Sequence, residues 1–431
     1  MKNCTTKTLL TFVFIFSILA IGAAQTQGIA TATEINVALG DPGLSFKYES
    51  TLGVYGEPYV FSGDHINQPE GLFVDSDGAL YVAERVGSQV IKYGSDGSYE
   101  MSFGFYGNPW QHDNFLYQPS SVSVAENGHV FVVYLQAIKE YGPTGNFIRS
   151  FPEEDPWASG NDNGHFDYPY DLIFSNDGTK LFVSDVNNKR IQVFSFDLDG
   201  KLVYEETIDA TTALMPEGGF NEIRGLDIDS SGRLYITDYI DARIHRCTFN
   251  PATPQWECEN YFGVAGEPGD DLEHLNYPYD IYIDSSDNIF IADSNNFRIL
   301  KCTDTGTCAI FAGGEWGEGN DQLTFIAGIT GDASGNIYVS DKDNFRVQVF
   351  DSDGNYLKTY GTTGVPYVTD NNHINTAQGV AVDSDGSILI TEGALGKRSF
   401  WLKKVTMGAS KKAISPAITK KARMDWLRWM V

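Results

Sequence analysis

The chain has 431 residues and a formal net charge of -27 at pH 7. So acidic a protein is not expected to bind nucleic acid, because phosphate recognition needs clustered basic side chains. The 44 glycines, the 13% of aromatic residues and the lack of long helical periodicity favour an all-β fold, in which a closed ring uses this length as one domain.

The N-terminal segment has the pattern of an export signal. Two lysines precede the apolar run 9–21, and small residues follow at positions that a signal peptidase favours. The run is shorter than the roughly 20 residues that a membrane-spanning helix needs. We therefore predict a signal peptide over residues 1–24 and a linker over 25–39. The protein is expected to be secreted, or held at the cell surface or in the periplasm, with no transmembrane segment.

A repeat of about 51 residues runs through the rest of the chain. Its seven copies have their opening strands at Gly71, Ser121, Asp171, Gly225, Asp280, Gly328 and Gly379. Each copy contains short alternating runs, such as NIYVSD and RVQVFD, between turns rich in Asp, Ser and Gly. This pattern predicts four antiparallel strands per copy, and four-stranded units at this period form the blades of a β-propeller.

The elements P-x-[GD]-[IL], G-x-[IL]-[YF]-[VI] and D-x-x-N-x-R-[IV]-x-x-F resemble NHL repeats over residues 40–396. The resemblance implies a single β-propeller. The copy number gives seven blades, and six remains the alternative because the second copy is short and has Tyr134 where Asp is expected. Residues 40–56 look like an outermost strand, which the last copy lacks. An N-terminal strand is therefore expected to close the ring.

Four Asp–Arg pairs recur at a spacing of five, with the Asp ending one strand and the Arg beginning the next. They are Asp185–Arg190, Asp238–Arg243, Asp293–Arg298 and Asp341–Arg346. A hairpin places such residues opposite each other, where unlike charges attract. A reactive site would not be copied around a ring. These pairs are therefore predicted to be structural, with the intervening asparagines forming the turns.

Five cysteines are present, and Cys4 lies in the predicted signal peptide. An even number of cysteines in an exported chain suggests disulfides. Each remaining cysteine has a partner beyond the next turn, which predicts Cys247–Cys258 and Cys302–Cys308; other pairings would bridge separate blades. The DSDG runs at 75–78, 351–354 and 383–386 lack the further ligands of a calcium loop and are expected to be turns.

A candidate ligand-binding face follows from the histidines His65, His165, His274 and His373, which stand four residues before the residue that opens a blade. In an up-and-down blade, the loop between blades and the loop between the second and third strands lie on one face. At this face the opening-strand residues Glu70, Asp171, Arg224, Asp280 and Gln378 are expected to line the mouth of the central channel. A recurring loop His more often caps a turn than binds a metal, so no metal site is assigned.

The functional hypothesis is a secreted, non-catalytic binding or scaffold module that holds a protein, peptide or glycan on this face. The alternative is a metal-dependent hydrolase or lyase in the channel. Peptide-amidating lyases are similar to this template but carry zinc-binding His directly after the blade-opening Pro, where this chain has Glu70, Ser120, Tyr170 and Tyr279. Gluconolactonase-like propellers use an early Glu beside a divalent ion, as Glu70 could. No cofactor is predicted; calcium and zinc stay open, as does the oligomeric state.

The segment 397–431 contains ten Lys or Arg and one acid, and the repeat template is lost as it begins. By register Arg398 would take the usual Ile or Val position. The segment is interpreted either as a basic tail, disordered or lying with its tryptophans on an anionic surface, or as non-native sequence from a reading-frame slip or truncation, which we favour slightly.

Overall fold

The computed structural model describes residues 34–35, 45–52, 69–105, 114–153, 159–198, 200–213, 215, 218–363, 373–374, 376–383, 386–392 and 401–408. The chain divides into two units, Met1–Thr31 and Ala32–Val431, and the description concerns the second. The predicted signal peptide lies outside the described residues. In the described residues no helix is long and apolar enough to cross a membrane.

Seven antiparallel sheets follow one another along the chain. The first three blades are β3 (Pro69–Val74), β4 (Leu80–Glu84), β5 (Gln89–Tyr93) and β6 (Tyr99–Phe103); β7 (Pro119–Val124), β8 (Val130–Tyr134), β9 (Ala137–Tyr141) and β10 (Phe147–Phe151); and β11 (Pro169–Phe174), β12 (Lys180–Asp185), β13 (Arg190–Phe196) and β14 (Leu202–Ile208).

The next three blades are β15 (Ile223–Ile228), β16 (Leu234–Asp238), β17 (Arg243–Asn250) and β18 (Gln255–Gly263); β19 (Pro278–Ile283), β20 (Ile289–Asp293), β21 (Arg298–Cys302) and β22 (Cys308–Gly313); and β23 (Ile326–Gly331), β24 (Ile337–Asp341), β25 (Arg346–Phe350) and β26 (Tyr356–Gly361). Short 3-10 turns, η1 (Ser294–Asn296) and η2 (Lys342–Asn344), lie in the central hairpins of the fifth and sixth blades.

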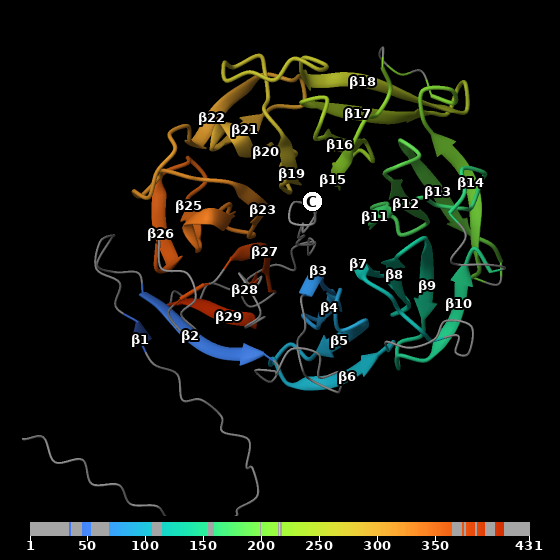
Figure 1. The fold of residues 1–431 in the computed structure, drawn as a ribbon, viewed down its shortest axis with the longest axis horizontal. Coiled ribbons are helices and arrows are strands. Elements are labelled where there is room, and N and C mark those ends of the chain that lie inside the picture. Colours follow the sequence, from blue (N-terminus) through green and yellow to red (C-terminus); the bar gives the residue numbers. More distant parts are fainter. Residues whose placement is uncertain are drawn as a thin grey trace, which may run out of the picture. The chain divides into compact units, whose positions relative to one another are not determined.

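The first strands of the blades surround the centre of the ring (Figure 1). Each contacts the next in the order β3, β7, β11, β15, β19, β23 and β27 (Ala377–Val382), and β27 contacts β3. The prediction of seven blades is confirmed, and the six-blade alternative is wrong. The second copy forms a full blade with a shorter hairpin, in which Tyr134 pairs with Ala137, whereas Asp185 pairs with Arg190 in the third.

The last blade combines both ends of the described chain. Its order is β1 (Glu34–Ile35), β2 (Ser45–Leu52), β29 (Trp401–Gly408), β28 (Ser387–Glu392) and β27. The predicted closure by an N-terminal outer strand is confirmed, because β2 pairs antiparallel with β29. In Figure 1 the blue β2 lies beside the red β29.

Strand β29 lies inside the segment that was expected to be a tail, so the propeller continues beyond residue 396 to Gly408. Glu392 pairs with Trp401 in the register in which Asp341 pairs with Arg346. The residue in the Ile or Val position is therefore Leu402, and the prediction for Arg398 is wrong. The reason is that eight residues separate β28 from β29, whereas four separate β24 from β25. Residues 409–431 lie outside the described residues.

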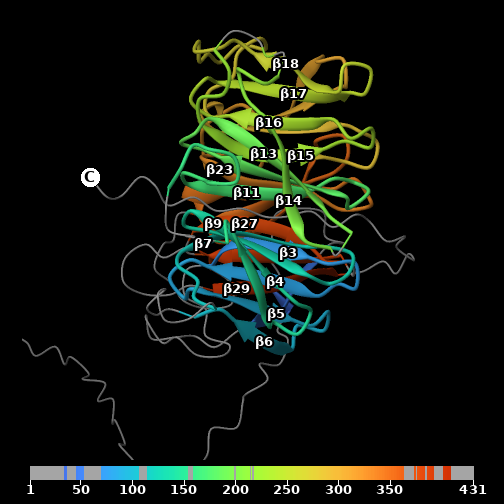
Figure 2. The same cartoon turned by 90° about the vertical axis from the view of Figure 1, so that its right-hand side faces the viewer.

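The core consists of seven apolar clusters, one between each pair of consecutive blades. The cluster that closes the ring packs Leu72 and Val82 of the first blade against Ala381 and Leu389 of the last. Both faces of a blade are thus covered, which explains the strands rich in Val and Ile. Seen from the side, the strands run from one face of the ring to the other, and the connecting loops lie on these two faces (Figure 2).

Candidate functional site

The Asp–Arg pairs fasten the loops between blades. In the fifth blade Arg298 Nε donates to Asp293 Oδ2 over 2.7 Å, and both side chains are buried. The other guanidinium nitrogens of Arg298 donate to the carbonyl oxygens of Asp270, Asp271 and His274, in the loop that enters this blade. The pairs Asp185–Arg190 and Asp341–Arg346 repeat the 2.7 Å contact. In these three blades the motif joins a hairpin to the neighbouring loop.

The fourth blade departs from the predicted pair Asp238–Arg243. These residues face each other in the strand register, yet Arg243 forms its ion pair with Asp241, at 3.0 Å. Asp238 is instead contacted by the buried His245, at 3.3 Å. His245 occupies the position of Gln192, whose Nε2 contacts Asp185 in the third blade. In this blade the imidazole of His245 therefore makes the contact to the buried Asp that the arginine makes in the third, fifth and sixth blades.

Replacing His245 by Gln is expected to make stability less sensitive to acid. Burial lowers the pKa of His245 below its ordinary value of 6.5, so the unfolded chain takes up this proton more readily and stability is lost as the pH falls. Glutamine keeps the contact and does not titrate. Urea unfolding of both proteins between about pH 8 and pH 5 measures the difference. An equal loss of stability with acidity in both proteins would contradict the prediction.

The described histidines of the candidate face hold their loops through backbone hydrogen bonds. The carbonyl oxygens of His165 and His274 accept from Arg190 and Arg298, and that of His373 accepts from Lys403 Nζ. The imidazole of His165 lies 3.0 Å from the Asp162 carboxylate, and that of His274 lies 2.7 Å from the Asp271 carboxylate.

The hydrogen bond to the Asp271 carboxylate raises the pKa of His274. His65 lies outside the described residues. Among those that are described, no three His, Cys, Asp or Glu side chains converge as metal ligands. Within that part of the chain the donor set does not fit a zinc or calcium ion, so no chemical step is assigned to one.

The structure separates the five predicted mouth residues into two groups. Glu70, Arg224 and Gln378 are the second residues of their first strands. Asp171 and Asp280 are third residues and connect blades: Asp171 Oδ1 accepts from Ser121 Oγ over 3.1 Å, and Asp280 Oδ2 accepts from the backbone N–H of Ile329 over 3.0 Å. A register shift near the start of these first strands turns the side chain of the third residue toward a neighbouring blade.

A row of aromatic and cationic side chains, not predicted from the sequence, crosses four blades at this end of the first strands. We call it the aromatic row; its members are Tyr168, Tyr170, Arg224, Tyr239, Tyr277, Tyr279, Phe325 and Lys342. The Arg224 guanidinium lies 5.3 Å from the ring centroids of both Tyr170 and Tyr239. The Tyr279 ring lies 5.8 Å from Tyr239 and 5.2 Å from Phe325.

The aromatic row draws its members from three kinds of segment: first strands, central hairpins and the loops that enter a blade. A signal for it was present in the sequence, because Tyr-Pro-Tyr occurs twice, at 168–170 and 277–279. Across the ring the mouth is polar. There Arg85 lies 3.2 Å from Glu70 and donates to Gln118 Oε1. The mouth is therefore aromatic on one side and hydrogen-bonding on the other.

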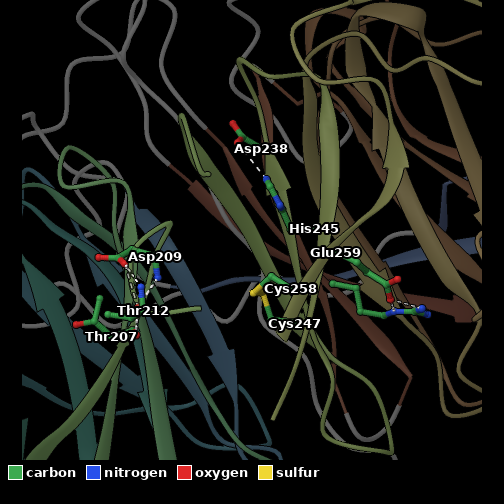
Figure 3. Close-up of a disulfide and its surroundings, with 9 residues drawn as sticks. Thr207, Asp209, Thr212, Asp238, His245, Cys247, Cys258 and Glu259 are labelled. Atoms are coloured by element: carbon green, nitrogen blue, oxygen red, sulfur yellow. Dashed lines mark hydrogen bonds and ion pairs between the residues drawn. A yellow bond between two sulfur atoms is a disulfide. The ribbon is translucent and has the colours of Figure 1, made fainter. Parts of the chain in front are cut away.

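The disulfides lie away from the mouth, between the two outer strands of their blades. Cys247–Cys258 joins β17 to β18, and Cys302–Cys308 joins β21 to β22. Figure 3 shows the first disulfide and, on the same strand, His245 turned toward Asp238. The DSDG aspartates serve their own turns, as where Asp351 Oδ1 accepts from the backbone N–H groups of Asp353 and Asn355.

The architecture and the repeated motif define the chain as a seven-bladed β-propeller that contains NHL repeats. The NHL repeat family matches residues 275–302 and 323–350. Among curated proteins, the chain is 30% identical over 177 residues to peptidyl-glycine alpha-amidating monooxygenase B of Xenopus laevis, covering 39% of this chain and 19% of that protein. It is 31% identical over 137 residues to a probable peptidyl-alpha-hydroxyglycine alpha-amidating lyase of Caenorhabditis elegans, covering 30% and 37%.

The chain thus spans well under two thirds of the curated relatives it matches. Among solved structures, virginiamycin B lyase from Staphylococcus aureus superposes with a TM-score of 0.54 at 13% identity, covering 84% of this chain and 99% of that one. At this identity the likeness concerns the fold alone.

Proposed function

We propose that the protein is an exported, non-catalytic binding module whose ligand, a protein, peptide or glycan, docks at the mouth of the ring on the face that bears the loops between blades. The observation that carries this proposal is the aromatic row, in which the rings of Tyr168, Tyr277 and Phe325 are half-buried and rest on the buried Tyr170, Tyr239 and Tyr279. Tyrosine side chains offer large contact areas at low cost in side-chain entropy and are enriched where binding energy concentrates. Two disulfides and the N-terminal segment support export.

The repeated polar residues support binding rather than catalysis. The Asp–Arg pairs and the loop histidines are engaged in holding loops, and the aspartates Asp171 and Asp280 join neighbouring blades. The positions directly after the blade-opening residue hold Glu70, Ser120, Tyr170, Arg224, Tyr279, Ala327 and Gln378. None of these is a histidine.

Screening of the protein against a glycan array and a displayed peptide library tests the proposal. Substitution of Tyr277 by Asn removes one ring from the aromatic row, and Asn tolerates the positive φ of 53° at this position. The matched control is Tyr99→Asn, which removes an exposed ring from the outer strand β6. Ligands of the mouth are expected to lose about tenfold or more in affinity with Tyr277→Asn and to keep it with Tyr99→Asn. Equal losses in both variants would contradict the proposal.

The second candidate, a metal-dependent lyase in the channel, is favoured by the similarity to amidating enzymes. A sharp test is the cleavage of a peptide that ends in α-hydroxyglycine, with metal content measured on the same sample. Turnover that depends on a stoichiometric, chelatable metal would establish the lyase. Ligand binding that persists unchanged in chelator, with no turnover, would establish the binding module.

A further inference from the structure

The exposed large apolar side chains of the described residues fall into two sets. One set lies on the third and fourth strands of the blades or in the turn between these strands: Tyr99, Ile148, Leu198, Val203, Phe249 and Ile310. The other set lies on the mouth face of the fourth to sixth blades, where Ile240 is 41% exposed, Leu272 49% and Trp316 67%. Single exposed apolar residues are ordinary, whereas apolar residues that gather on one surface mark interaction sites.

The three side chains of the second set come from neighbouring segments of the mouth face. Ile240 lies in the hairpin between β16 and β17, Leu272 in the loop between β18 and β19, and Trp316 in the loop between β22 and β23. The two loops end at the half-buried rings of Tyr277 and Phe325, which belong to the aromatic row. Leu272 and Trp316 therefore share their loops with two accessible members of that row.

Main-chain hydrogen bonds join these segments into a continuous band. The N–H of Gly266, in the first loop, donates over 2.9 Å to the carbonyl oxygen of Asp241, beside Ile240. The N–H of Gly314, in the second loop, donates over 2.9 Å to the carbonyl oxygen of Phe297, in the hairpin that is hydrogen-bonded to the first loop. We call this band the rim; it comprises residues 239–242, 264–277, 294–297 and 314–325.

The rim is strongly acidic. Its two loops contain no Lys or Arg, and their exposed carboxylates include those of Glu267, Asp270, Glu273, Glu315 and Glu318. None of these five forms an ion pair with a Lys or Arg of the described residues. The arginines that enter the fifth and sixth blades are buried, pair with the aspartates of their own hairpins and hold loop carbonyl oxygens. A partner that matches the rim therefore carries cations as well as apolar side chains.

We propose that the rim docks a basic peptide segment in which Lys or Arg side chains stand beside bulky apolar ones. This inference rests on the proposed function and narrows its ligand to one class. The apolar side chains pack on Leu272 and Trp316, since tryptophan is enriched where binding energy concentrates. The cations lie among the loop carboxylates, which speeds association and selects against acidic partners. A neutral glycan would leave this charge unmatched.

Selection from a displayed peptide library on the immobilised full chain, followed by fluorescence anisotropy with the enriched peptides, tests the inference. The enriched peptides are expected to carry a net positive charge and at least one bulky apolar side chain. Leu272→Ser and Trp316→Ser are each expected to weaken binding about tenfold or more without lowering the melting temperature, because both side chains are exposed. The matched control is Ile310→Ser on β22, because Ile310 is also 49% exposed; it is expected to leave binding unchanged.

The charge of the rim provides a second readout. The double variant Glu267→Gln with Glu273→Gln is expected to weaken the same peptides and to reduce the dependence of their affinity on salt between about 50 mM and about 500 mM, because exposed charges attract less strongly when screened. The control is Glu126→Gln with Asp353→Asn. These two exposed carboxylates lie in turns on the opposite face, and their removal is expected to change neither the affinity nor its salt dependence.

Three results would overturn the inference: enrichment of neutral or acidic peptides, equal affinities of wild type and Trp316→Ser, and equal losses in Leu272→Ser and Ile310→Ser. Peptides that lose affinity with Tyr277→Asn but not with Trp316→Ser would reject the rim and leave the binding function standing, as would glycans as the only ligands. Self-association that is lost in Trp316→Ser would assign the rim to the basic segment 409–431 of a second copy and overturn the external peptide. Failure to find any ligand in either screen would reject the two proposals together.

Discussion

Truncation after residue 400 is expected to prevent the last blade from forming, whereas truncation after Gly408 is expected to leave the melting temperature close to that of the full chain. The reason is that β29 is the only strand that joins β2 to β28 in the described sheet. Without it β2 is separated from β28 and keeps only the two-residue strand β1 as a partner, so the last blade has unpaired edges, which are prone to aggregation. Thermal unfolding and size-exclusion chromatography of the two truncated proteins measure the difference.

Two buried ion pairs make the loss of β29 more costly. Lys403 Nζ lies 2.6 Å from Glu392 Oε1, with both side chains 1% exposed, and Lys404 Nζ lies 2.9 Å from Asp383 Oδ2. Removal of one partner of a buried pair destabilises by about 3–5 kcal/mol, because the other charge stays buried without compensation. If the protein truncated after residue 400 melts as the full chain does, β29 is dispensable and the reading-frame hypothesis for this segment stands.

Arg298→Met is expected to lower the free energy of unfolding by about 3–5 kcal/mol, because the variant leaves the buried Asp293 carboxylate without its cation. It also removes the donors to three carbonyl oxygens of the loop that enters the fifth blade. Denaturant unfolding with the disulfides intact measures the loss. Hydrogen exchange is expected to show faster opening of residues 264–277.

The pH dependence of this loss provides a second readout. Burial already raises the pKa of Asp293 in the wild type, and removal of Arg298 raises it further. When the pKa of a carboxyl is raised in the folded state, stability is lost as the pH rises through that pKa. The difference in free energy of unfolding between wild type and Arg298→Met should therefore shrink in acid, where Asp293 is protonated. Lys201→Met is the control, because Lys201 and its partner Glu153 are both exposed. This substitution is expected to lower the free energy of unfolding by less than about 1 kcal/mol. Equal costs for the two variants would refute a stabilising role of the Asp293–Arg298 pair.

The fold was predictable because its information is repeated. Seven copies of one pattern specify the strands and the blade count, and the hairpin pairing of Asp293 with Arg298 follows from their spacing alone. The mouth was only partly predictable. The register shift that turns Asp171 and Asp280 toward neighbouring blades leaves no mark in the alternation of apolar residues.

The aromatic row shows a second limit of sequence reasoning. Arg224, Tyr239 and Phe325 come from a strand, a hairpin and a loop in different copies, so they meet only when the ring is formed. The replacement of an Arg by His245 at Asp238 likewise depends on side-chain length and burial within a single blade.

The pairing of Ser45 with Gly408 has a consequence for the order of events during synthesis. Strand β2 of the last blade is synthesised before the other six blades, and its partner β29 is synthesised after them. The six intervening blades can form hairpin by hairpin as they emerge, but the face of the first blade at Leu72 and Val82 stays uncovered until Ala381 and Leu389 arrive. Contacts between such distant segments form slowly. Closure of the ring is therefore expected to be a late and slow step of folding, during which this apolar face of the first blade stays open to solvent.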